Sequence, residues 1–102
     1  MVVPKSPTFA PSARAEFEAA AEWYETHADG LGERFVSCVD EIVGRIEASP
    51  AGFPIWDGDR RFRRAVAQRF PYVIFFRELP DSIEVTAVAH AAREPGYWLK
   101  RK

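Results

Sequence analysis

The last twelve residues before the C-terminal lysine gather side chains that could bind and cleave a phosphodiester. They include His90, Arg93, Tyr97, Trp98 and Arg101. Histidine exchanges a proton near neutral pH, arginine can hold a phosphate oxygen, and an aromatic ring can stack on a base. Cleavage of RNA through its own 2′-hydroxyl needs a proton acceptor, a proton donor and charge stabilisation, with no obligatory metal. This segment is therefore a candidate ribonuclease site, although a histidine at the rim of a sheet and aromatic rings that close a core are equally ordinary uses of such residues.

A second group of candidate residues is the run Arg60-Arg61-Phe62-Arg63-Arg64. The pattern predicts a short strand with guanidinium groups on both faces, so we expect it at an edge or on an exposed face. Arginine forks match phosphate geometry, and a nucleic-acid backbone or an acidic protein partner would complement them. The alternative is that these arginines pair with acidic helices of the same chain. Arg61, Arg63 and Arg64 are the candidate target-binding residues of this run.

Metal and cofactor chemistry finds no support in the sequence. It contains no zinc motif, phosphate loop or nucleotide fingerprint, and its two histidines stand 63 positions apart. We therefore expect no metal and no cofactor. The one cysteine, Cys38, cannot close an intramolecular disulfide, and its place on an apolar helical stripe favours a core role over catalysis.

Length and composition indicate one small soluble domain. A chain of 102 residues with 47% hydrophobic and 14% aromatic residues is long enough for one core and too apolar for disorder. The longest apolar run, 72–76, is far short of the roughly 20 residues that span a bilayer. The first residues lack the apolar segment of a signal peptide, so the expected location is the cytoplasm.

The net charge of -1 conceals an asymmetry between the two halves of the chain. Residues 1–50 hold four basic and nine acidic residues, whereas residues 51–102 hold ten basic and six acidic ones. Such a division suggests a basic functional face on an acidic support, although two ordinary solvated faces would give the same counts.

Two amphipathic helices are expected in the acidic half. The first covers 12–27, with Ser12 as N-cap and early glutamates at the positive end of its dipole, and it ends near Gly30. The second runs from about Leu31 or Glu33 to Ala48 and forms a hairpin with the first. Gly44 in its interior suggests a close contact with a helix or sheet. The apolar stripes are Ala13, Phe17, Ala20, Ala21, Tyr24 and Ala28 on the first helix, and Leu31, Phe35, Cys38, Val39, Ile42 and Ile46 on the second.

In the basic half, the sequence pattern changes to one that is typical of β-strands. Ranges 60–66, 72–77 and 83–90 are rich in β-branched and aromatic residues, and Leu79-Pro80-Asp81-Ser82 forms the turn between the last two. They predict an antiparallel meander. In the last strand we expect the helices to cover the face that carries Ile83, Val85, Ala87 and Ala89. A short strand near 7–10 could join the sheet at an edge, where neighbouring prolines are tolerated. The predicted fold class is α+β, an N-terminal helical hairpin on a small antiparallel sheet, in one domain over residues 1–102.

Taken together, these motifs resemble the RelE/ParE toxin superfamily of bacterial type II toxin-antitoxin systems. The resemblance covers nearly the whole chain and rests on the order and spacing of its motifs. They are Trp23-Tyr24-Glu25, Gly30-Leu31-Gly32-x-Arg34-Phe35, Arg63-Arg64, Arg69-Phe70-Pro71-Tyr72 and Val88-Ala89-His90-x-x-Arg93-x-Pro95-x-Tyr97-Trp98. The resemblance implies the same helical hairpin on a small sheet. It also implies a cognate antitoxin that binds with a helix or an added strand, in a toxin-antitoxin hetero-oligomer. The expected antitoxin contact is an apolar groove beside the first helix, near Trp23 and Tyr24.

The superfamily offers two targets. RelE-like members cut messenger RNA on the ribosome, and ParE-like members bind DNA gyrase without acting as nucleases. This chain has Tyr72 where RelE-like ribonucleases commonly carry an arginine, and its pI near 6.1 does not favour strong attraction to RNA. Arg93 and Tyr97 nevertheless fall where those ribonucleases place catalytic residues, and His90 could transfer a proton. The sequence therefore favours a ParE-like gyrase inhibitor, in which Tyr72, Trp98 and Arg101 join the arginines as target-binding residues. The alternatives are a metal-independent endoribonuclease with His90, Arg93 and Tyr97 as catalytic residues, and a non-toxic member that only binds antitoxin.

Overall fold

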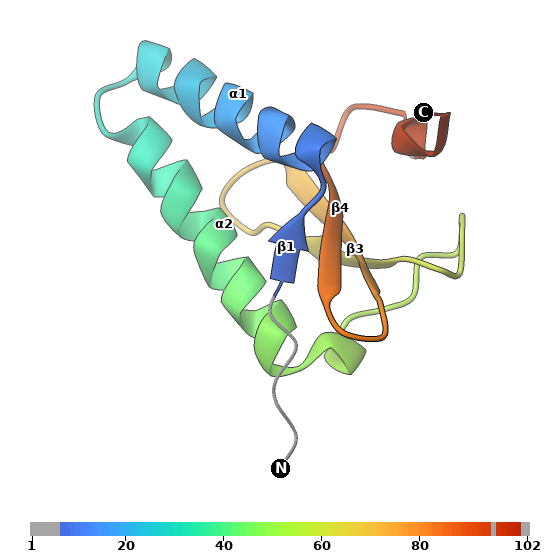
Figure 1. Cartoon of the computed structure of the whole chain (residues 1–102). Coiled ribbons are helices and arrows are strands. Elements are labelled where there is room, and N and C mark those ends of the chain that lie inside the picture. Colours follow the sequence, from blue (N-terminus) through green and yellow to red (C-terminus); the bar gives the residue numbers. More distant parts are fainter. Residues whose placement is uncertain (1–6, 95, 101–102) are drawn as a thin grey trace.

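A computed structural model describes residues 7–94 and 96–100, and it packs a helical hairpin against one face of a four-stranded sheet (Figure 1). Along the chain the elements are β1 (Pro7–Phe9), α1 (Pro11–His27), α2 (Leu31–Ala48), β2 (Arg63–Val66), β3 (Tyr72–Glu78) and β4 (Ile83–His90), with short 3-10 helices η1 (Pro50–Gly52) and η2 (Tyr97–Lys100). The α+β class and the hairpin predicted from the sequence are confirmed.

Helix α1 begins one residue before the predicted start. Pro11 takes the first helical position, where its missing N–H costs nothing, and Ala10 becomes an N-cap without a side-chain hydrogen bond. The prediction that Ser12 caps the helix is therefore wrong. No acidic residue lies in the first turn either, so the expected support of the dipole by early glutamates is also absent.

The turn between the helices is held by a carboxylate and two glycines. Gly30 adopts φ of 82°, a conformation that favours glycine. Glu25 accepts hydrogen bonds from the backbone N–H groups of Gly30 and Gly32, each at 3.0 Å. A Cβ atom on Gly32 would lie 2.6 Å from the carbonyl oxygen of Ala21, so the two helices are in close contact here.

Gly44 does not have the close contact that the sequence suggested. It is exposed, and a Cβ atom there would meet nothing within 4 Å. The residue that lets the helices approach is Gly32, at the start of α2. Helical spacing alone does not show whether an interior glycine or a first-turn glycine lies at the contact between two helices.

The sheet has the strand order β1-β4-β3-β2. The three later strands form the predicted antiparallel meander, whereas β1 pairs in parallel with β4, so the sheet is mixed. β1 occupies an edge, as the prolines near it require.

The strand predicted for 60–66 begins only at Arg63. Asp59 explains the difference, because its Oδ1 accepts the backbone N–H of Arg61 at 3.0 Å and closes a local turn before the strand. Arg60 and Arg61 lie in this turn and not on the two faces of a strand.

The last strand does not keep one alternation along its length. Phe76 pairs with Val85 and Phe75 pairs with Ala87, so Thr86 is an extra residue that forms a bulge. Before the bulge, Ile83 and Val85 face the helices as predicted. After it the faces exchange, and the prediction for Ala87 and Ala89 is wrong, because both pack on the opposite side of the sheet.

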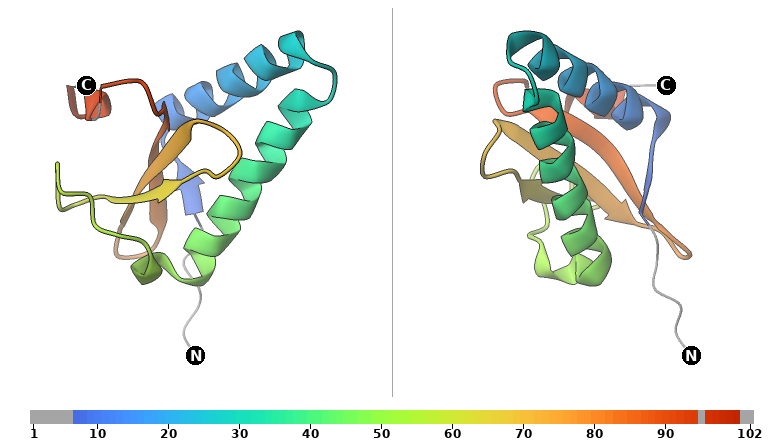
Figure 2. Two further views of the ribbon diagram at one scale, coloured as in Figure 1. Left: turned by 180° about the vertical axis from the view of Figure 1, so that it is seen from behind. Right: turned by 90° about the vertical axis from the view of Figure 1, so that its left-hand side faces the viewer.

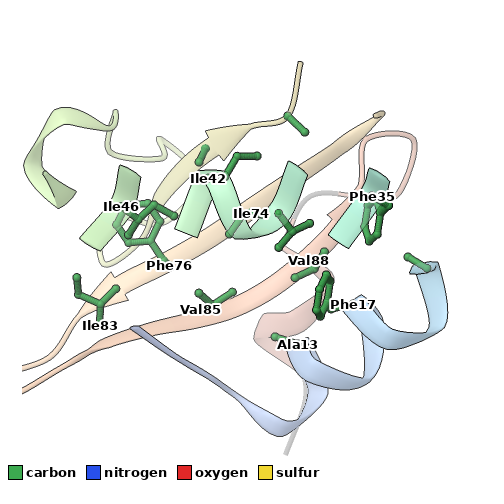
Figure 3. Close-up of a cluster of buried hydrophobic side chains, with 14 of the residues drawn as sticks. Ala13, Phe17, Phe35, Ile42, Ile46, Ile74, Phe76, Ile83, Val85 and Val88 are labelled. Carbon is green, nitrogen blue, oxygen red and sulfur yellow. The ribbon is translucent and has the colours of Figure 1, made fainter. Parts of the chain in front are cut away.

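Two hydrophobic cores result, one on each face of the sheet. The larger core lies under the helical hairpin, where Phe17 of α1 and Phe35 of α2 meet the sheet at Ile74 and Val88 (Figure 3). The smaller core lies on the other face and is covered by the C-terminal segment and the connection before β2 (Figure 2). Its members are Trp56, Phe62, Val73, Phe75, Ala87, Ala89, Tyr97 and Trp98.

Candidate functional site

His90 ends β4 at the molecular surface. Its imidazole Nδ1 accepts the backbone N–H of Ala92 at 3.0 Å, which fixes the ring over the turn that follows the strand. Tyr72 stands opposite it on β3, and the two rings meet edge-on with centroids 5.2 Å apart. The other imidazole nitrogen of this exposed residue is directed away from that hydrogen bond and could exchange a proton with a ligand.

Arg93 and Tyr97 are brought together, but by a residue that the sequence did not single out. The hydroxyl of Tyr97 donates a short hydrogen bond to Oε2 of Glu16, and a guanidinium nitrogen of Arg93 lies 3.9 Å from the same oxygen. The guanidinium also lies 3.6 Å above the centre of the Tyr97 ring. Oε1 of Glu16 accepts the backbone N–H of Val88 at 3.0 Å. One carboxylate thus joins α1, β4 and the C-terminal segment.

The sequence did hold a signal for Glu16. It stands three residues after Ala13 and four before Ala20, both of which are buried, so helical spacing places it on the inward stripe of α1. A carboxylate on an apolar stripe needs polar partners, and Arg93 and Tyr97 supply them.

Tyr72 keeps its hydroxyl protonated at neutral pH. Burial, and then the nearby Tyr24 and Glu16, raise the pKa of Tyr72 above its ordinary value of 10.0. Its ring packs against Phe35 and Tyr24 at centroid distances of 5.0 and 6.2 Å. Tyr72 is therefore a neutral residue that supports the core.

Trp98 is a core residue. Its side chain is 4% exposed and its ring lies 4.1 Å from that of Phe75. Its indole Nε1 has no hydrogen-bond partner in the part of the chain that the structure describes. Burial leaves little of this ring for the target contact predicted from the sequence, and Arg101, the other predicted contact in this segment, lies outside the described residues.

The side chains of the arginine-rich run differ in whether they pair with other groups of the protein. Arg61 lies in a fork with Asp59, whose carboxylate it approaches to 2.6 Å, and this hydrogen bonding lowers the pKa of Asp59 to about 2. Arg63 donates to the carbonyl of Phe53 at 2.7 Å and lies 3.7 Å from Glu78. Arg64 is exposed and makes no ion pair within residues 7–94 and 96–100. The alternative of pairing with the acidic helices does not occur for Arg61 or Arg63, whose partners lie in loops and on β3.

The two residues predicted to bind antitoxin differ in exposure. Trp23 is 56% exposed and stacks on His27 with ring centroids 3.7 Å apart. Tyr24 is 9% exposed, and its ring meets Phe70 edge-on at 4.9 Å. Trp23 can reach a partner directly, whereas Tyr24 supports the segment that contains Phe70.

The same segment forms one wall of a groove that the sequence did not reveal. This groove of about 880 Å³ lies between α2 and the connection from β2 to β3, which curves toward the helix (Figure 2). We call it the α2 groove; it is lined by Gly30, Leu31, Glu33, Arg34, Ser37, Cys38, Glu41, Ile42, Arg45, Val66, Gln68, Arg69 and Phe70. Cys38, expected in the core, packs against the core and also lines this groove.

The described residues contain neither a cluster of metal ligands nor a helical membrane span. Within them, no three His, Cys, Asp or Glu side chains come together in a way that could hold a metal ion. No helix among the same residues combines the length and hydropathy needed to cross a bilayer.

Comparison with known proteins gives two findings. The family described as "ParE toxin of type II toxin-antitoxin system, parDE" matches residues 8–95. A solved structure titled "Chromosomal ParDE TA system from P. aeruginosa" shares the fold, with a TM-score of 0.64 and 18% sequence identity over 85% of this chain and 96% of that one. No curated protein matches the chain significantly.

Proposed function

The chain belongs to the ParE toxin family of type II toxin-antitoxin systems, and from this membership we propose that it arrests growth by inhibiting DNA gyrase. As a type II toxin it has an antitoxin as partner. Since gyrase acts on chromosomal DNA, the proposed site of action is the cytoplasm.

The observation that carries the proposal is the engagement of Arg93 and Tyr97 by Glu16. A ribonuclease needs a cation and an acid-base group that can reach its substrate. Here the charge of Arg93 faces the Glu16 carboxylate, and the Tyr97 hydroxyl donates to that same group. Burial raises the pKa of Tyr72 above its ordinary value of 10.0, which disfavours that residue as the base at neutral pH. These contacts support a structural role for Arg93 and Tyr97 and favour the target that needs no cleavage chemistry.

The surface proposed for the gyrase contact is the exposed arginine-rich run. Arg64 is exposed without an ion-pair partner within the described residues, and Arg61 is exposed beside Asp59. Arg63 is anchored to Phe53 and Glu78 and would hold β2 in place beneath them. Arginine forks of this kind suit an acidic protein surface.

The direct test is a supercoiling assay with purified gyrase and the purified toxin. We expect loss of supercoiling, restored when antitoxin is added, and a weaker effect for Arg64→Glu. The matched control is Arg14→Glu, an exposed arginine on α1. Full supercoiling in the presence of excess wild-type toxin would exclude gyrase as the target.

His90 favours a second candidate function, the RelE-like endoribonuclease. It is exposed, and one of its imidazole nitrogens is not engaged by Ala92. If His90 transfers the proton, expression of the toxin should cleave messages at defined positions on the ribosome. His90→Ala and Arg93→Ala should then abolish cleavage while the fold is preserved. Intact messages in growth-arrested cells would remove this candidate.

Antitoxin binding without toxicity is the third reading. Trp23 is the proposed direct contact, because it is the exposed member of the predicted pair. Expression of the toxin without antitoxin distinguishes the readings. Growth arrest that co-expressed antitoxin relieves supports a toxin in a hetero-oligomer, and unimpaired growth supports a member that only binds.

A further inference from the structure

The outer edge of β4 is paired with a strand along part of its length. β1 pairs with residues 83–85, and the backbone N–H of Ala10 donates to the carbonyl of Val85 at 2.9 Å, where this pairing ends. Farther along β4, the backbone N–H of Val88 needs another acceptor, because Val88 is 2% exposed. Oε1 of Glu16 is that acceptor, at 3.0 Å. A side chain of α1 thus satisfies the backbone of β4 beyond the point where β1 ends.

The second oxygen of this carboxylate meets donors from the segment that follows β4. The Tyr97 hydroxyl donates to Oε2 in a short hydrogen bond, and a guanidinium nitrogen of Arg93 lies 3.9 Å from the same oxygen. The backbone N–H of Arg93 donates to the carbonyl of His90 at 3.0 Å, and its guanidinium lies over the Tyr97 ring, so the protein holds both donors in place. The Glu16 carboxylate therefore occupies a site made of a backbone amide, a hydroxyl and a guanidinium.

These types of donor bind phosphate as well as carboxylate. The arginine fork matches the geometry of both anions, and backbone N–H and hydroxyl groups donate to phosphate oxygens. The side chain of Arg93 is 58% exposed and that of Glu16 is 16% exposed, so the site opens to solvent beside the guanidinium. A phosphate that approached Arg93 from solvent would meet the negative charge of Glu16 behind it.

Glu16 has two advantages over an anion from solvent. It is carried by α1, which the buried residues Ala13 and Ala20 hold against the core, so its carboxylate loses no translational freedom when it binds. A second anion placed beside it would also be repelled by like charge. While the Glu16 carboxylate is in place, the site excludes phosphate.

We propose that Val88, Arg93 and Tyr97 form an anion-binding site that the chain fills with its own Glu16 carboxylate, and that a phosphate group enters this site when that carboxylate is removed. Glu16 then determines the specificity of the C-terminal segment, because it withholds from phosphate the arginine and the tyrosine that a nuclease would use. This inference rests on the proposed function, which takes Arg93 and Tyr97 as structural residues.

The experiment titrates the toxin with inorganic phosphate at constant ionic strength and follows the backbone amide of Val88 by NMR. Glu16→Ala vacates the site, and its Kd for phosphate should be at least about tenfold lower than that of the wild type, because the donors lose the anion that they hold. Glu18→Ala is the matched control, since Glu18 is exposed on the same helix and carries an equal charge. Its Kd should stay within about twofold of the wild-type value. Adding Arg93→Ala to Glu16→Ala should abolish the gain.

Circular dichroism in chloride shows whether Glu16→Ala is folded without phosphate. If it is unfolded, its folding becomes the measurement, because an anion that binds the folded state stabilises it. Recovery of the helical signal in phosphate, and not in chloride of equal ionic strength or in the Arg93→Ala background, would support the proposal. Absence of recovery would overturn it.

Two results of the titration would also overturn the proposal. One is an equal affinity of the wild type and Glu16→Ala for phosphate, and the other is a gain in affinity that survives Arg93→Ala. The supercoiling assay with wild-type toxin tests the proposed function separately. A wild-type toxin that excludes phosphate and leaves gyrase active would contradict the proposed function alone.

Discussion

The carboxylate of Glu16 joins three parts of the chain that lie far apart in sequence. It accepts from the backbone of Val88 and from the hydroxyl of Tyr97, and it faces Arg93. We expect Glu16→Ala to lower the free energy of unfolding by about 2–3 kcal/mol, because a half-buried N–H and a hydroxyl lose a charged acceptor. Urea unfolding measures the change. Glu18→Ala is the control, since Glu18 is exposed on the same helix, and its effect should stay within about 0.5 kcal/mol. Equal effects of the two substitutions would contradict this role.

The contact between Asp59 and Arg61 leads to a prediction for the pKa of Asp59, which can be measured by titration. The ordinary pKa of Asp59 is 3.8, and hydrogen bonds from Arg61 lower it to about 2 in the folded protein. A depressed pKa means that this contact favours the folded state above pH 3.8 and that its contribution disappears as the pH falls through about 2. In an NMR titration, Arg61→Ala should return the pKa of Asp59 toward 3.8, whereas Arg60→Ala should leave it near 2. A midpoint near 3.8 in the wild type would show that the fork does not form in solution.

Single residues show how far the sequence could predict the site. Residue type and order were enough to select Arg93 and Tyr97, which the structure brings together, whereas the His90 ring lies against Tyr72. Glu16, which contacts both Arg93 and Tyr97, lies on another element, and its contacts depend on where α1 crosses β4. The burial of Trp98 and Tyr24 could not be predicted either, because a sequence does not tell which aromatic ring closes a core and which one faces a partner.

The close approach of α1 and α2 depends on Gly32. A Cβ atom there would lie 2.6 Å from the Ala21 carbonyl oxygen and 2.9 Å from the Glu25 carboxylate, so Gly32→Ala forces the helices apart. We expect a loss of about 2–4 kcal/mol in the free energy of unfolding, measured in urea. Gly44→Ala is the matched control, because that position is exposed and open. It should stabilise the protein by about 0.5–1 kcal/mol through helix propensity. A destabilised Gly44→Ala variant would contradict the packing described for α2.

At the scale of elements, regular patterns were predictable and interruptions were not. The helices and the strand 83–90 follow from periodicity, and the observed bounds of β4 are the predicted ones. The bulge at Thr86 exchanges the faces of Ala87 and Ala89 without any mark in the sequence pattern. The turn closed by Asp59 shortened the predicted arginine strand in a similar way. Neither the bulge nor the turn leaves a trace in the hydropathy pattern.

The whole molecule rests on two cores, and the smaller one depends on Trp98. Trp98→Ala should lower the free energy of unfolding by about 3–5 kcal/mol, because a 4%-exposed ring that packs on Phe75 is removed. Trp23→Ala is the control of equal size, since Trp23 is 56% exposed, and it should cost less than about 1 kcal/mol. Urea unfolding followed by circular dichroism compares the two. A small effect of Trp98→Ala would mean that the C-terminal segment does not cover the sheet in solution.

The position of β1 also limits the order in which parts of the fold can form during synthesis. β1 pairs only with β4 among the described strands, and its Thr8 hydroxyl donates to the Ile83 carbonyl, 75 positions away. During synthesis the helical hairpin emerges early and holds an apolar face that has no sheet to cover until β3 and β4 follow. Glu16 likewise waits for Val88, Arg93 and Tyr97. Long-range pairings of this kind close late, so the sheet and the Glu16 contacts can form only after β4 and the C-terminal segment have left the ribosome.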